Sequence, residues 1–160
     1  MTERRQRAMG IDAGERRIGM AIGDELGLIA SPLGMVERGP GDVERIVQTA
    51  REYGAGLVVV GLPMGLSGRE GPQAAAARAF AATLEEAAAG AVDVTFWDER
   101  LTSAVAERAL RERAGGRKAR KSDVRRGEID AMAAAVILQG YLDSARNSFH
   151  SRSPRGPEAR

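Results

Sequence analysis

The sequence predicts an α/β protein with a mixed five-stranded sheet flanked by helices, and three observations carry this prediction. Three strand-like segments come first along the chain. Strand and helix patterns then alternate over the rest of it. One later strand is the continuous apolar run Leu57-Val58-Val59-Val60, which is typical of a strand buried on both faces. Three antiparallel strands followed by β-α alternation give a mixed sheet covered by helices, and 160 residues suit one domain.

The first half of the chain supplies three strands and a helix. We expect strands over residues 8–12, 18–22 and 31–36, the second because it alternates large and small side chains. Pro32 weakens the third, since proline cannot donate to a sheet ladder. After a break at residues 39–41, apolar side chains recur at helical spacing until Gly54, at Val43, Ile46, Val47 and Ala50.

The second half alternates strands with helices. The strand at residues 57–60 is followed by the loop GLPMGLSGREGP, and an Ala-rich helix then begins at Pro72 and ends at Gly90. Residues 92–97 form the predicted fifth strand. Apolar residues Leu101, Val105 and Ala109 indicate a further helix, residues 113–123 a charged loop, and residues 128–143 the last helix.

The predicted domain spans residues 7–145, between a flexible N-terminus at 1–6 and a disordered tail at 146–160 that is rich in Ser, Arg and Pro. The N-terminus lacks the apolar core of a secretory signal. No apolar run approaches the roughly 20 residues of a membrane span. We therefore expect a soluble cytoplasmic protein with no membrane partner.

Composition restricts the chemistry. The chain has no cysteine and a single histidine, His150. This excludes disulfides, zinc fingers, iron–sulfur clusters and thiol nucleophiles, and it disfavours Ser-His-Asp catalysis. A metal site would have to use oxygen ligands, which favours Mg²⁺ or Mn²⁺.

Acidic side chains stand at three places where packing residues are expected. Asp12 ends the first strand, the pair Asp98-Glu99 follows the fifth, and Asp130 begins the apolar stripe of the last helix. Small residues line one side of the first two strands, at Ala8, Gly10, Gly19, Ala21 and Gly23. Acids that converge on such a face would form an oxygen-only metal site suited to phosphodiester chemistry.

Each acid also has a purely structural explanation. Asp130 could lie in a first helical turn, where the helix dipole favours it. Asp12 could cap the turn after its strand, and Asp98 or Glu99 could be a surface acid at a strand end. Taken together, in a chain without cysteine and with one histidine, the acids favour a catalytic site.

Four segments in order resemble the YqgF/RuvX family, a ribonuclease-H-like group. They are GIDAGERRIGMAIGD, VVGLPMGLSGREGPQA, DERLTSAVAE and IDAMAAAVILQGYLD, within residues 8–143. The resemblance implies a ribonuclease-H-like fold and a metal-dependent nuclease. It places the catalytic acids at Asp12, Asp98, Glu99 and Asp130, with Asp12, Glu99 and Asp130 as metal ligands and the choice between Asp98 and Glu99 open. Ala13, Glu15, Gly65 and Ser67 depart from the family's usual residues.

Basic residues concentrate beside the predicted site. A flexible basic arm directly before Asp130 could hold a phosphate backbone, although a solvated charged loop is the plainer alternative. Aromatic residues are too few for much base stacking, so we expect recognition by backbone and shape. The candidate nucleic-acid-binding residues are Arg16, Arg17, Arg117, Lys118, Arg120, Lys121, Arg125 and Arg126.

The resemblance implies an endonuclease for structured RNA, acting at the end of pre-16S ribosomal RNA and with the ribosomal precursor particle as a partner. A DNA junction resolvase is the second possibility, and it would require a homodimer rather than a monomer. Two other classes are a nucleotide-binding module and a non-catalytic RNA-binding assembly factor. The chain is too short to hold the two domains that the former needs, and the acids argue against the latter.

Overall fold

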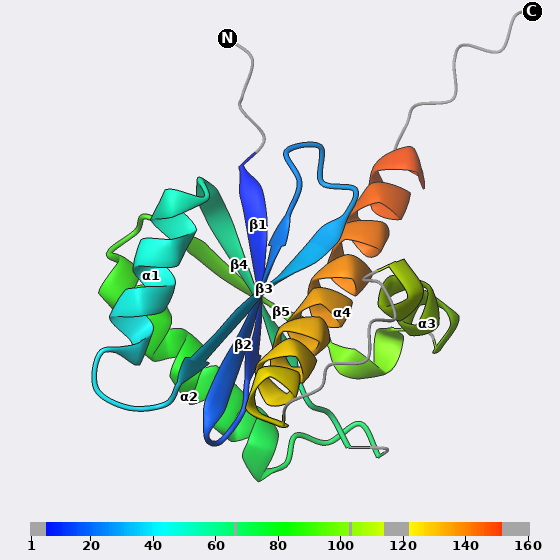
Figure 1. The fold of residues 1–160 in the computed structure, drawn as a ribbon. Helices are drawn as coiled ribbons and strands as arrows, with labels where there is room; N and C mark the ends of the chain where they lie inside the picture. Colours follow the sequence, from blue (N-terminus) through cyan, green and yellow to red (C-terminus); the bar gives the residue numbers. More distant parts are fainter. Residues whose placement is uncertain (1–5, 66, 103, 114–121, 152–160) are drawn as a thin grey trace, which may run out of the picture.

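The computed structural model describes residues 6–65, 67–102, 104–113 and 122–151 (Figure 1). The strand and helix patterns of the sequence appear in the expected order, with one additional 3-10 turn. The strands are β1 (Arg7–Ala13), β2 (Arg17–Gly23), β3 (Ala30–Glu37), β4 (Ala55–Leu62) and β5 (Asp93–Asp98). The helices are α1 (Asp42–Glu52), α2 (Pro72–Ala88), the 3-10 turn η1 (Glu99–Leu101), α3 (Ala104–Arg113) and α4 (Ser122–Ser151).

The five strands form one mixed sheet in the order β3-β2-β1-β4-β5. β1 pairs antiparallel with β2, and β2 pairs antiparallel with β3. β4 is parallel to both β1 and β5. The predicted fold class is therefore confirmed, including the antiparallel start and the parallel continuation.

Helices cover both faces of the sheet (Figure 1). α1 and α2 pack on one face, where large side chains such as Ile11, Ile46 and Leu84 are fully buried. α4 crosses the other face, with α3 beside it. On that side the sheet presents small residues, so the helix backbone lies close to the strands. A Cβ on Gly10 would lie 2.6 Å from the backbone oxygen of Ala134.

The last helix is longer than expected. α4 begins at Ser122 and ends at Ser151 rather than spanning 128–143. The expected disordered tail at 146–160 is therefore wrong for residues 146–151, and residues 122–123 of the expected charged loop belong to the helix. Residues 144–151 contain neither proline nor glycine to end the helix, and Arg146 donates to Asp143 one turn earlier at 2.9 Å. No described helix is long and apolar enough to cross a membrane.

Candidate active site

The carboxyl ends of the three parallel strands place two of the predicted acids at one edge of the sheet. Asp12 lies at the end of β1, and Glu99 follows β5 directly as the first residue of η1. β4 lies between these two strands and ends at Leu62, which pairs with Asp98. Loops outside the carboxyl ends of strands are where open α/β sheets bind ligands.

A glycine brings the third acid to this edge. Gly19 of β2 pairs with Asp12 across the ladder. A Cβ on Gly19 would overlap the backbone oxygen of Asp130. Only a residue without a side chain lets α4 descend onto β2 here, and the descent sets Asp130 above Asp12. The small-residue face of β1 and β2 thus lets the backbone of α4 lie close to the sheet.

A second glycine makes room for Glu99. A Cβ on Gly61 of β4 would lie 2.8 Å from Oε1 of Glu99 and would overlap the Ile137 side chain of α4. The Glu99 carboxylate therefore lies over the strand between β1 and β5. From there its charge is repelled by that of Asp12, while the side chain remains exposed to solvent on its other side.

Electrostatics link these three acids. Burial raises the pKa of Asp12, and the negative charge of Asp130 raises it further. Burial also raises the pKa of Glu99, with added repulsion from Asp12 and then from Asp98. Repulsion between neighbouring carboxylates favours protonation or a bound cation.

Asp98 and Glu99 are adjacent in sequence but have different environments. Asp98 accepts a hydrogen bond from the backbone N–H of Arg100 at 3.0 Å, which caps η1. The Arg100 guanidinium also pairs with Asp98 at 2.6 Å and lowers its pKa. Glu99, by contrast, lines the same pocket as Asp12. This difference could not be read from the dipeptide.

Arg17 holds the third acid. Its Nε donates to Oδ2 of Asp130 at 2.6 Å, and both side chains are partly buried. Within the described part of the chain, no three His, Cys, Asp or Glu side chains are gathered closely enough to hold a metal ion. The donor chemistry suits a divalent cation, but Asp130 is directed to Arg17.

The pocket at the acids has a volume of about 320 Å³. Asp12, Glu99 and the exposed Glu15 give it a negative lining. Arg38, which follows β3, contributes a positive charge to the same lining. Arg38 is not among the residues predicted from the sequence, although its place directly after the third strand was a usable signal. Pro63, Pro72 and Gln73 complete the side formed by the glycine-rich loop and the start of α2.

The predicted nucleic-acid-binding residues are only partly described. Arg16 is exposed in the β1–β2 turn, and Arg126 is exposed on α4. Arg17 forms an ion pair with Asp130. Arg125 lies in α4, where the structure describes its backbone but not its side chain. The remaining four lie outside the described residues: Arg117, Lys118, Arg120 and Lys121.

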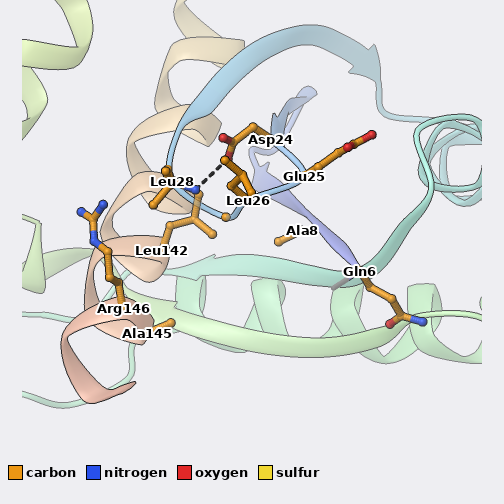
Figure 2. Close-up of a pocket in the computed structure, with 10 residues that line it drawn as sticks. Gln6, Ala8, Asp24, Glu25, Leu26, Leu28, Leu142, Ala145 and Arg146 are labelled. Atoms are coloured by element: carbon orange, nitrogen blue, oxygen red, sulfur yellow. Dashed lines mark hydrogen bonds between the residues drawn. The ribbon is translucent and has the colours of Figure 1, made fainter. Parts of the chain in front are cut away.

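A larger cavity of about 610 Å³ lies at the other end of the sheet (Figure 2). It is formed by the β2–β3 loop, the start of β1 and the end of α4, and it includes Leu28 and Leu142. Its acid Asp24 accepts hydrogen bonds from the backbone N–H groups of Leu28 and Ile29, at 2.7 and 3.0 Å. Asp24 thus stabilises its own loop, and none of the predicted catalytic acids lines this cavity.

Comparison with known proteins supports the resemblance found in the sequence. The family model described as "RuvX: Holliday junction resolvase" matches residues 6–144. A protein of Pelotomaculum thermopropionicum named "Putative pre-16S rRNA nuclease" is 44% identical over 95% of this chain and 98% of its own length. Relatives of the same name from Thermobifida fusca and Anaeromyxobacter sp. are 46% and 47% identical, over 88% and 86% of this chain and 89% and 96% of their own lengths.

Among solved structures, the Thermus thermophilus RuvC complex with a Holliday junction substrate aligns with a TM-score of 0.60 at 17% identity. The alignment covers 89% of this chain and 96% of the RuvC chain. At this identity the likeness shows the fold alone, and it confirms the ribonuclease-H-like architecture expected from the resemblance.

Proposed function

The chain belongs to the RuvX family, and from this premise we propose that it is a divalent-metal-dependent nuclease for structured RNA. The substrate we propose is pre-16S ribosomal RNA, named in its curated relatives, processed in the cytoplasm during ribosome biogenesis. The observation that carries the proposal is the gathering of acids at one sheet edge, where Asp12 and Glu99 line one pocket and the charge of Asp130 raises the pKa of Asp12.

We assign the metal ligands to Asp12, Glu99 and Asp130. Their oxygens match the preference of Mg²⁺ and Mn²⁺. A divalent ion held there would lower the pKa of a bound water and stabilise the leaving oxygen of a phosphodiester. Asp12 and Glu99 line the pocket from two strand ends. Asp130 would serve as the third ligand once its carboxylate was released from the Arg17 guanidinium, which lies 2.6 Å away in this structure.

The adjacent acids provide a matched pair of variants for the test. Glu99→Gln and Asp12→Asn each remove one charge from the pocket, and Asp130→Asn removes the third. Each is expected to slow cleavage of pre-16S RNA in Mg²⁺ or Mn²⁺ by about 100-fold or more. Asp98→Asn keeps a residue type that caps helices well, so its cleavage rate should stay within a few-fold of the wild type.

The same assay decides the substrate and the class of protein. A four-way DNA junction is cleaved in parallel, because the matching family model is described as a junction resolvase. Symmetric cleavage of the junction by a homodimer, with the RNA left intact, would replace the RNA proposal. Cleavage by Asp12→Asn and Asp130→Asn at the wild-type rate would refute the metal site. A wild type that binds the RNA without cutting it would indicate an assembly factor.

A further inference from the structure

Arg38 follows β3 at the same edge of the sheet as the acids. Its backbone N–H donates to the carbonyl oxygen of Arg16 at 2.8 Å, which continues the pairing of β2 and β3 by one residue. Its side chain then turns toward the β1–β2 turn and lines the pocket that Asp12 and Glu99 share. The position is therefore set by the sheet rather than by a free loop.

Three contacts fix the Arg38 guanidinium. Its Nη1 donates to the carbonyl oxygen of Gly14 at 3.1 Å. Its Cζ lies 5.0 Å from the centre of the Phe80 ring of α2. Its Nε is 3.7 Å from Asp42, whose carboxylate already accepts hydrogen bonds from the backbone N–H groups of Gly39 and Val43. The guanidinium is thus positioned in advance, and its ion pair is long.

The charge around the pocket gives Arg38 a role. Among the described residues that line it, three are acidic and Arg38 is the basic one. A phosphodiester that enters this pocket meets the repulsion of the acids. A guanidinium presents five N–H donors in a planar fork that matches phosphate oxygens, and the hydrogen bond to Gly14 uses one of its nitrogens.

We propose that Arg38 binds a backbone phosphate of the nucleic acid at the mouth of the pocket, beside the carboxylates of Asp12 and Glu99. The inference rests on the proposed function, because it takes nucleic acid as the ligand. It adds a substrate-binding residue from β3 to the acids of β1, η1 and α4. Its position fixes the register of the phosphate backbone across the sheet edge.

The test measures binding without cleavage. Arg38→Met removes the charge and the donors but keeps a side chain that packs on an aromatic ring. Arg45→Met on the exposed side of α1 is the matched control, since it removes the same charge away from the pocket. A fluorescein-labelled RNA hairpin with single-stranded flanks is titrated with each protein in EDTA at several salt concentrations, and thermal unfolding checks that each variant is folded.

The expected result is about tenfold weaker binding by Arg38→Met, with the slope of log K against log salt smaller in magnitude by about 1. Arg45→Met should bind within about twofold of the wild type. Arg38→Lys should recover the salt slope, because it restores the charge. The inference is overturned if Arg38→Met binds like the wild type, or if Arg45→Met loses as much affinity.

Failure of this inference and failure of the proposed function give different results. If the wild type cleaves RNA in Mg²⁺ or Mn²⁺ while Arg38→Met binds it as tightly as the wild type, only the role of Arg38 is wrong. If the wild type shows no metal-dependent cleavage, the nuclease proposal fails whatever the binding data show.

Discussion

The negative charges of Asp12 and Glu99 destabilise the folded state, and protonation of either carboxylate would relieve this. Burial and the neighbouring acids raise the pKa of both groups. A carboxyl whose pKa is higher in the folded than in the unfolded state binds its proton more tightly when folded. The fold is therefore stabilised as the pH falls through this window, and it loses that stability as the pH rises.

Asp12→Asn should accordingly raise the free energy of unfolding at pH 7 in EDTA. The gain in stability should shrink as the pH falls toward 3.8, the ordinary pKa of aspartate, because the wild-type carboxyl is then protonated and uncharged like the asparagine. Urea unfolding between pH 4 and pH 8 measures both effects. A variant less stable than the wild type at pH 7 would contradict the repulsion described here.

Asp98→Asn is the control of opposite sign. The Arg100 guanidinium lowers the pKa of Asp98. The ionised Asp98 carboxylate therefore stabilises the fold at a pH above the ordinary pKa of aspartate, and this contribution is lost as the carboxylate is protonated in acid. Asp98→Asn should be slightly less stable than the wild type at pH 7, and the two should converge as the pH falls.

At the scale of single residues, the sequence identified the acids but not their environments. Asp12 and Asp130 stood out because they interrupt packing patterns. The environments of Asp98 and Glu99 depend on the 3-10 turn and on Gly61, which no local pattern indicates. Arg38 was missed because its importance comes from a pocket formed by β1, β4, η1 and α2, and not from its neighbours in sequence.

Among the elements, α4 has the strongest influence on the site, and its approach depends on Gly19. Gly19→Ala would place a methyl group against the backbone oxygen of Asp130, and a backbone cannot rotate away as a side chain does. The helix would have to lift from β2, which overpacking data put at about 1–3 kcal/mol of lost stability. We expect this loss in urea unfolding, together with a cleavage rate at least about 10-fold lower, since Asp130 moves with the helix.

Gly127→Ala on the same helix is the matched control. A Cβ there would meet Cγ of Met35 at 3.4 Å, an ordinary contact. Because alanine favours helix more than glycine, this variant should gain about 0.8 kcal/mol of stability and cleave like the wild type. If Gly19→Ala proves as stable and active as Gly127→Ala, the close approach of α4 to β2 does not position Asp130.

Element order could be predicted from the sequence, and element ends less well. The alternation of strands and helices and the small-residue faces were visible as patterns. The length of α4 was not, because its first residues are charged and its last are polar, while the apolar stripe covers only the part that packs on the sheet. Hydrophobic periodicity reports burial, so a helix that extends beyond the sheet is invisible to it.

For the whole molecule, the sheet joins two hydrophobic layers that meet the site from opposite sides. One layer lies under α1 and α2, and the other under α4. The proposed ligands come from β1, η1 and α4, so they come together only when both layers are formed. A divalent ion that needs all three should then bind the folded state and not the unfolded chain.

This coupling makes metal binding measurable as stability. At 100 times the dissociation constant, a ligand specific for the folded state adds about 2.7 kcal/mol, which for a chain of this size is about 5–10 °C in Tm. Thermal unfolding of the wild type in Mn²⁺ should show such a shift against EDTA at equal ionic strength. Asp12→Asn should be more stable than the wild type in EDTA. Its Tm should nevertheless rise in Mn²⁺ by less than about a third of the wild-type shift, because the ion loses one ligand. An equal gain in both proteins would mean that the ion binds elsewhere, and the site at the sheet edge would then have to act without it.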